Sequence, residues 1–248
     1  MKKVGQEFIL SSYDNGIETY RTAAEELGLW QSETAVIQQY FKKTDQIIDI
    51  GCGAGRTTFG MYKRGYNHLA GVDLNPRMVE AALTIAKENQ YNILFQIEDA
   101  TQLSFPDQQF DAALFSFNGL MSIPEKGNRL QAFKEIHRIL KKGGTFIFTT
   151  HDREADTRFL EFWKEEKEKW EKGENDPRVY DFGDLITHSP DVNREIYIHI
   201  PKRSEVIEYL EATKFTLIDD FFRPERYQES ESVKAFSGDC RFWIVRKS

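Results

Sequence analysis

The sequence is poor in cysteine, long apolar runs and clustered positive charge. Cysteine occurs twice, at Cys52 and Cys240, which excludes a disulfide framework and a zinc site of four thiolates. No apolar run approaches the roughly 20 residues that a membrane-spanning helix needs, and no basic block offers a footprint for a phosphate backbone. From these absences we expect a cytoplasmic protein that has neither a membrane nor DNA as a partner.

Length and composition indicate a globular protein. Of the 248 residues, 40% are apolar and 29% are charged, which is ordinary for a folded chain with a sizeable core. The net charge of −7 disfavours nucleic acid as a partner, although RNA stays open. We expect a monomer or a homodimer.

Residues 46–150 alternate short apolar runs with amphipathic stretches, as βαβ crossovers and a parallel sheet require. The apolar runs predict strands near 47–50, 69–73, 93–98, 111–116 and 145–150. The amphipathic stretches predict helices over 57–63, 76–88 and 128–140. Pro76 suits a first helical turn, and Gly143-Gly144 is expected to end the third helix.

The flanking segments predict further helices and an antiparallel hairpin. Period-two alternation predicts that the hairpin strands lie at 178–188 and 193–200. The other expected elements are helices over 16–27, 32–41 and 203–212 and strands over 215–221 and 240–245. The Glu- and Ser-rich segment between those last two strands is expected to be a loop.

A strongly charged helix is predicted over 154–172. Phe159, Phe162, Trp163 and Trp170 fall largely on one of its faces. An apolar face of this kind favours packing against the core over a cofactor box.

A glycine-rich turn follows the first predicted strand, in Asp49-Ile50-Gly51-Cys52-Gly53-Ala54-Gly55-Arg56. Glycines at alternate positions let the backbone turn sharply and approach a ligand closely. A dinucleotide fingerprint needs glycine where Arg56 stands, and Asp49 would repel a phosphate. No Gly-Lys-Ser/Thr follows, which excludes a P-loop. The turn therefore favours a phosphate-free cofactor that carries an amino acid.

The turn resembles motif I of the class I S-adenosylmethionine-dependent methyltransferases, Asp/Glu-x-Gly-x-Gly-x-Gly, and the similarity continues over residues 46–150. The resemblance implies an α/β, Rossmann-like three-layer sandwich. Its sheet would be mostly parallel and seven-stranded, in the order 3-2-1-4-5-7-6 with strand 7 antiparallel, and an inserted antiparallel hairpin would form a lid. The implied divisions of a single domain over 1–248 are a helical cap (1–44), a cofactor-binding core (45–151), the inserted lid (152–201) and a closing helix with two strands (202–248).

The resemblance also implies S-adenosylmethionine as the cofactor and S-adenosylhomocysteine as the product. Asp73 ends the second strand, where the family grips both ribose hydroxyls, and Asp99 follows the third, where the family holds adenine. Glu98 is an alternative to Asp99. The implied cofactor-binding residues are Asp49, Gly51, Cys52, Gly53, Gly55, Arg56, Asp73, Leu74, Asn75, Met78, Asp99, Ala100, Ser116 and Phe117.

The sequence indicates the residues of the acceptor pocket less clearly than those of the cofactor site. The candidates are Tyr13, Tyr20, Asn118, His151 and Trp163. His151 ends the fifth strand and is the candidate general base, although a structural contact is the alternative. Histidines 151, 188 and 199 lack the spacing of metal ligands, so we expect no metal.

Methyl transfer to a small molecule is the predicted function. The end of the fourth strand, Ser116-Phe117-Asn118-Gly119, lacks the Asn/Asp-Pro-Pro-aromatic pattern of the family's amino-methylating nucleic-acid enzymes and the Pro-Cys of its cytosine-C5 enzymes. The alternatives are a regulatory module that binds S-adenosylmethionine without transferring its methyl group, and an RNA-modifying methyltransferase. A nucleotide-dependent oxidoreductase is a rival that Arg56 argues against.

Overall fold

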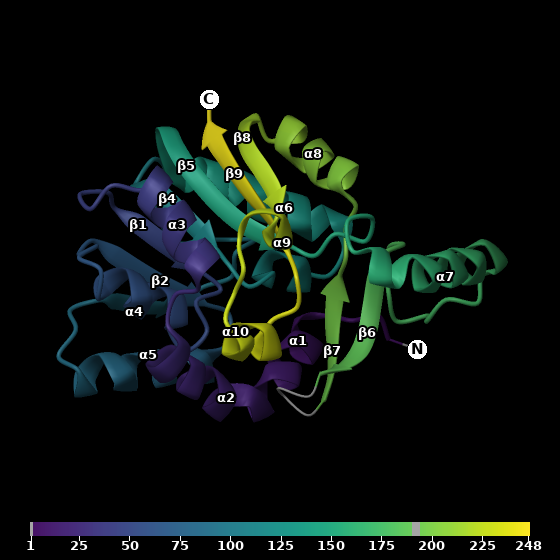
Figure 1. Ribbon diagram of the computed structural model, residues 1–248, viewed down its shortest axis with the longest axis horizontal. Coiled ribbons are helices and arrows are strands. Elements are labelled where there is room, and N and C mark those ends of the chain that lie inside the picture. Colours follow the sequence, from purple (N-terminus) through teal and green to yellow (C-terminus); the bar gives the residue numbers. More distant parts are fainter. Residues whose placement is uncertain (1, 190–193) are drawn as a thin grey trace.

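A seven-stranded sheet forms the centre of the molecule, in a computed structural model that describes residues 2–189 and 194–248. The strand order is β3-β2-β1-β4-β5-β9-β8, and β9 runs antiparallel to both of its neighbours (Figure 1). The strands are β1 (Ile47–Ile50), β2 (Leu69–Asp73), β3 (Leu94–Ile97), β4 (Phe110–Phe115), β5 (Leu140–Thr150), β8 (Phe215–Phe222) and β9 (Arg241–Lys247). The predicted sheet order and its antiparallel strand are confirmed.

Helices cover both faces of this sheet. Ile47 packs in the cluster that contains residues of α3 and α4, whereas Ile48 packs with residues of α6 and α8, because successive strand residues point to opposite faces. Both faces of β1 are therefore buried, which explains its unbroken apolar sequence. The covering helices are α3 (Gln31–Tyr40), α4 (Arg56–Tyr62), α5 (Pro76–Glu88), α6 (Lys126–Ile139) and α8 (Arg203–Ala212).

Three segments from distant parts of the sequence gather near one edge of the sheet (Figure 1). They are the N-terminal helices α1 (Gln6–Tyr13) and α2 (Ile17–Thr22), the hairpin of β6 (Asp184–Ser189) and β7 (Arg194–His199), and the C-terminal helices α9 (Arg223–Arg226) and α10 (Glu231–Phe236). The predicted antiparallel hairpin is confirmed, but its first strand begins at Asp184 and not at residue 178 as predicted. Asn193, where its second strand was expected to begin, lies outside the described residues.

Two predicted boundaries are wrong. Gly143 and Gly144 do not end a helix, because α6 ends at Ile139 and both glycines lie within β5. They permit an irregularity in the pairing of β4 with β5, since Gly143 has a φ of +77° and a Cβ on Gly144 would lie 3.0 Å from the carbonyl oxygen of Asp111. The segment between β8 and β9 is not a plain loop: it forms α9 and α10, and the Ser230 hydroxyl accepts from the backbone N–H of Val233 at the start of α10. The sequence prediction also missed α1.

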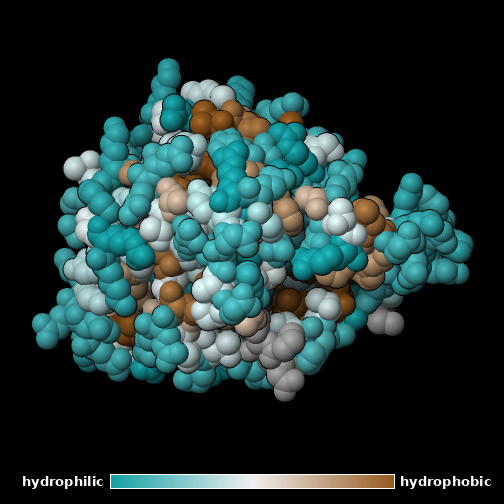
Figure 2. All heavy atoms as spheres, viewed as in Figure 1, coloured by the Kyte–Doolittle hydropathy of each residue, from teal (hydrophilic) through white to brown (hydrophobic). Residues whose placement is uncertain are grey.

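The charged helix α7 (Leu160–Lys172) projects away from the body of the molecule. Trp163 is buried against Phe182, but Phe159 is 51% exposed and Phe162 is 38% exposed. The prediction of a core-facing aromatic side is therefore wrong for these two phenylalanines. Hydrophilic side chains cover the free end of the helix (Figure 2). Among the described residues, no helix is long and apolar enough to cross a bilayer.

Candidate active site

A cavity of about 530 Å³ opens at the carboxyl ends of β1, β2 and β4. On the sheet side its wall includes the glycine turn, the end of β2 and the segment after β4. Residues of α1, the β6–β7 hairpin and the segment after α10 line it from the other side. The predicted site residues that line it are Tyr13, Tyr20, Gly51, Gly53, Asp73, Leu74, Asn75, Met78, Asp99, Ala100, Ser116, Phe117, Asn118 and His151.

The glycine turn needs glycine for two separate reasons. Gly51 and Gly53 have φ values of +62° and +55°, in the left-handed region that other L-residues adopt at a cost. A Cβ on Gly51 would lie 2.5 Å from the ring of Phe115, which itself lines the cavity. The turn thus brings the backbone to the wall of the cavity with no side chain in between.

Asp73 is held by backbone groups of the turns around it. One carboxylate oxygen accepts from the N–H of Gly53 and the other from the N–H of Asn75, both at 2.8 Å. Burial raises the pKa of Asp73, while these backbone hydrogen bonds oppose the shift. Each oxygen retains accepting capacity, as a grip on two ribose hydroxyls requires.

Asp99 and Glu98 both line the cavity, but their carboxylates are engaged differently. Both Glu98 oxygens accept from Ser104. In Asp99, one oxygen accepts from the N–H and hydroxyl of Thr101 at 2.8 and 2.7 Å, and the other accepts a longer bond of 3.3 Å from the Gln6 amide. Asp99 is therefore the better placed of the two to accept from an adenine amine.

Aromatic rings from three segments meet at the cavity. Phe117 stacks on Phe236, with ring centroids 5.0 Å apart and an angle of 13° between the planes. Tyr20 meets both rings edge-on, at 6.2 and 6.1 Å. The negative faces of such rings attract a cation.

Asn118 and His151 form a hydrogen-bonded pair in the wall of the cavity. Nδ1 of His151 lies 2.9 Å from the backbone carbonyl of Asp239, and Nε2 lies 3.2 Å from Nδ2 of Asn118. A carbonyl oxygen can only accept, so Nδ1 carries the proton and Nε2 accepts from Asn118. Burial lowers the pKa of His151 and favours this neutral form.

Five predicted site residues do not line this cavity. Cys52 is buried and borders a separate hollow of about 40 Å³ together with Arg56. Gly55 turns the chain into α4, where a Cβ would lie 2.5 Å from the Phe59 ring. Trp163 lies in the first turn of α7, and its ring packs on Phe162 and Phe182 instead of reaching the cavity.

Asp49 and Arg56, the other two, are bound by neighbouring side chains. One oxygen of Asp49 accepts from the hydroxyls of Thr57 and Thr58 at 2.6 Å, and burial raises its pKa to about 6. Arg56 makes a bidentate ion pair with buried Glu33, with both distances 2.7 Å. Glu33 also accepts from the hydroxyl of Ser116, so this pair lies directly behind the cavity wall.

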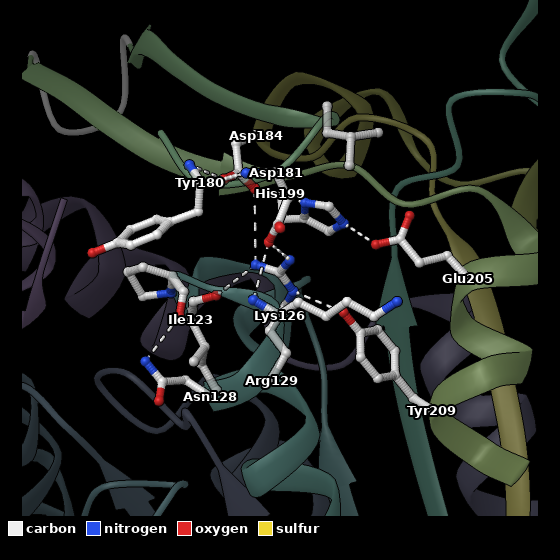
Figure 3. A network of polar contacts seen from close by, with 12 residues as sticks. Ile123, Lys126, Asn128, Arg129, Tyr180, Asp181, Asp184, His199, Glu205 and Tyr209 are labelled. Carbon is white, nitrogen blue, oxygen red and sulfur yellow. Dashed lines mark hydrogen bonds and ion pairs between the residues drawn. The ribbon is translucent and has the colours of Figure 1, made fainter. Parts of the chain in front are cut away.

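A buried polar network holds the hairpin in place (Figure 3). Arg129 of α6 is fully buried and donates to the hydroxyl of Tyr197 in β7 at 3.1 Å and to Asp181 at 2.8 Å. His199 of β7 lies between Asp184, at 2.7 Å, and Glu205 of α8. Burial alone would raise the pKa of both carboxyls, but the hydrogen bonds from His199 hold them below their usual values. The network therefore fixes a wall of the cavity to the core helices.

Several cavity residues escaped the sequence prediction. Gln6 and Ile9 belong to α1, and Phe236, Ser237 and Gly238 lie in the segment that was predicted to be a loop. The pair Phe8-Ile9 was a weak signal of an amphipathic helix. Phe236, a single aromatic in a polar stretch, gave no signal of its own.

The chain resembles known proteins in its core and in its whole fold. Residues 47–144 match the family model described as "Methyltransferase domain". The chain is 31% identical over 150 residues to the probable methyltransferase ltbC of Aspergillus luteorubrus, which covers 57% of this chain and 52% of that protein. The chain spans about half or less of the length of these curated relatives. The matched region is 52% of ltbC and 23% of the eEF1A lysine and N-terminal methyltransferase homolog of Drosophila melanogaster.

Two solved structures show the same fold. A SAM-dependent methyltransferase of Methanosarcina mazei matches with a TM-score of 0.70 and 22% identity, covering 89% of this chain and 98% of that one. The 1,6-didemethyltoxoflavin-N1-methyltransferase of Burkholderia thailandensis, solved with 1,6-didemethyltoxoflavin and S-adenosylhomocysteine, matches with a TM-score of 0.61 and 18% identity, covering 98% and 87%.

Proposed function

We propose that the chain is a class I S-adenosylmethionine-dependent methyltransferase that acts on a small-molecule acceptor, from the premise that residues 47–144 match a methyltransferase-domain model. The observation that carries the proposal is the cavity in which the glycine turn, Asp73, Asp99 and the end of β4 meet. Open parallel sheets bind their ligands at this edge.

The residues present fit S-adenosylmethionine. Gly51 and Gly53 place bare backbone in the cavity wall, and Asp73 and Asp99 offer acceptors for the ribose hydroxyls and the adenine amine. One buried oxygen of Asp49 has no hydrogen-bond partner among the described residues, but Asp49 does not line the cavity, which leaves Asp73 and Asp99 as the carboxylates that would contact the cofactor. The stacked pair of Phe117 and Phe236 suits a sulfonium.

S-adenosylmethionine held by Asp73 and Asp99 would supply an activated methyl group, whose transfer to the acceptor atom would leave the electron pair of the broken carbon–sulfur bond on sulfur and release the acceptor's proton to solvent. The chain's own contribution is to position the acceptor and to exclude water. Orientation of two reactants can lower an activation barrier by up to about 7–11 kcal/mol. Positioning can therefore accelerate the transfer without a dedicated base. The hairpin, α1 and α10 provide the enclosure.

The general-base role of His151 stays a prediction. Both of its ring nitrogens are engaged, Nδ1 by the carbonyl of Asp239 and Nε2 by the amide of Asn118. In this arrangement His151 orients Asn118, and an acceptor reaches its Nε2 lone pair only after the amide has moved.

Calorimetry and a methyl-transfer assay test the proposal. Purified protein is titrated with S-adenosylmethionine, S-adenosylhomocysteine, NAD and NADP, and we expect binding of the first two alone. Labelled S-adenosylmethionine is then supplied with a metabolite extract and, separately, with total RNA. Transfer to the extract supports the proposal, transfer to RNA supports the RNA-modifying alternative, and tight binding without transfer supports a regulatory module. Failure to bind either form of the cofactor would refute all three.

A further inference from the structure

We propose that the acceptor is a largely apolar molecule without negative charge, and that Oδ1 of Asn118 accepts a hydrogen bond from its nucleophilic group. The inference rests on the proposed function and deepens it. Three features carry it: the charge of the cavity wall, the apolar side chains that the N-terminal segment, the loop before α6 and β7 contribute to it, and the enforced orientation of the Asn118 amide.

The cavity wall carries negative charge and no positive charge. Three carboxylates line it, Asp73, Glu98 and Asp99, and none of its described residues is lysine or arginine. Residues 1 and 190–193, which the structure does not describe, contain neither type. A phosphate or carboxylate on the acceptor would lose its hydration and find no counter-charge, at a cost of several kcal/mol. The wall therefore selects against anionic acceptors.

Apolar side chains line the cavity from three segments outside the sheet. They come from the N-terminal segment, from the loop before α6 and from one face of β7. These residues are Val4, Ile9, Ile123, Pro124, Ile196 and Ile198. Successive residues of a strand point to opposite faces, which explains why Ile196 and Ile198 line the cavity. Tyr197 and His199 point the other way, into the buried network that holds the hairpin. An apolar acceptor is stabilised here by burial of its surface.

The orientation of the Asn118 amide follows from its neighbours. The carbonyl of Asp239 fixes the proton on Nδ1 of His151, so Nε2 requires a donor, and the NH₂ group of Asn118 supplies it. Oδ1 of Asn118 is therefore the free end of the amide. It is buried and has no hydrogen-bond partner among the described residues, although Asn118 is in the cavity wall.

Backbone geometry also fixes Asn118. Its φ is +59°, and its N–H donates to the hydroxyl of Thr149 at 2.9 Å. Asparagine tolerates this left-handed conformation better than most residues. A buried acceptor oxygen without a partner costs free energy, and the O–H or N–H of an acceptor molecule would satisfy it.

Fractionation of the extract tests the charge of the acceptor. A metabolite extract is separated at neutral pH on an anion exchanger, and both fractions are supplied with labelled S-adenosylmethionine. We expect label in the unretained fraction, in a product that partitions into an organic solvent. Label confined to the retained, anionic fraction would overturn the inference while leaving the proposed function intact. Absence of label from both fractions would count against the proposed function itself.

A binding measurement gives a readout independent of turnover. The thermal unfolding midpoint of protein saturated with S-adenosylhomocysteine is measured in the presence of 1-naphthol, 1-naphthoic acid or 1-naphthyl phosphate. These three compounds share one ring system and differ in charge. We expect 1-naphthol alone to raise Tm. An equal rise with either anion, or no rise with 1-naphthol at millimolar concentration, would overturn the inference.

Substitution of Asn118 tests its positioning role. Asn118→Gly tolerates the positive φ and removes the oxygen, so we expect KM for the labelled acceptor to rise about tenfold, the loss of one hydrogen bond, with kcat little changed. S-adenosylhomocysteine should bind within twofold of the unmodified protein. Asn118→Asp retains an oxygen and should recover most of the affinity.

Asn89→Gly is the control, because Asn89 caps the C-terminal end of α5 outside the cavity and its side-chain amide donates to the carbonyl of Ile85. It should leave KM unchanged. An unchanged KM in Asn118→Gly, or an equal loss of S-adenosylhomocysteine affinity, would overturn the positioning role.

Discussion

Replacement of Gly51 by alanine tests whether the turn after β1 needs a bare backbone. The added methyl group faces two obstacles. At a φ of +62° alanine is strained, and its Cβ would lie 2.5 Å from Cε2 of Phe115. Gly65→Ala isolates the first obstacle, because Gly65 has a φ of +86° and, among the residues that the structure describes, none that counts as a neighbour comes within 4 Å of its added Cβ.

The two variants should differ in magnitude. A left-handed alanine costs about 1–2 kcal/mol, which is the whole effect expected at Gly65. At Gly51 the displaced ring adds about 1–3 kcal/mol, for a total of about 2–5 kcal/mol. Phe115 also lines the cavity, so a shifted ring should weaken S-adenosylhomocysteine at least tenfold, which is about 1.4 kcal/mol.

Urea unfolding and calorimetry measure these quantities. We expect Gly65→Ala to lose stability without losing affinity, and Gly51→Ala to lose both. Equal free energies of unfolding in the two variants, with cofactor affinity intact in both, would refute the close approach at Gly51.

Three further predictions concern the same site. Asp73→Ala should weaken S-adenosylhomocysteine by about 1–3 kcal/mol in calorimetry, because charged hydrogen bonds are lost; an unchanged affinity contradicts the ribose assignment. Phe236→Ala should weaken S-adenosylmethionine more than S-adenosylhomocysteine, by about 0.5–2 kcal/mol, because only the former carries the sulfonium charge; equal losses argue against the aromatic contact. Glu33→Gln leaves Arg56 buried without its partner and should cost about 3–5 kcal/mol at pH 7 in urea unfolding. Burial would raise the pKa of Glu33, but Arg56 holds it below its ordinary value of 4.5, so the contribution is present above that pH and is lost as the pH falls through the folded pKa. A variant that kept the acid sensitivity of the unmodified protein would contradict this account.

Much of the sheet was predictable because its signals are local. The apolar run 47–50 predicts β1, and Gly51, Gly53 and Gly55 predict a turn with positive φ. Pro76 begins α5 as expected. Each of these elements depends on residues adjacent in the chain, so that period and residue type suffice.

Local signals also misled where tertiary contacts decide. Gly143-Gly144 looks like a helix end, yet the pairing of β4 with β5 uses both glycines inside a strand. The aromatic stripe of α7 looks like a core face, but Phe159 and Phe162 remain exposed because the helix projects from the body. In both cases the sequence pattern is real, but the segment that packs against it differs from the one that the pattern alone predicts.

By itself the sequence determined one wall of the cavity: β1, the glycine turn, Asp73 at the end of β2 and Asp99 after β3. Only the tertiary structure decided the other wall, to which α1, β7 and the residues at the end of α10 contribute side chains. The physical reason is that a turn's conformation is encoded by its own residues, whereas that wall is made by packing between segments up to about two hundred residues apart, which leaves no period in any one of them.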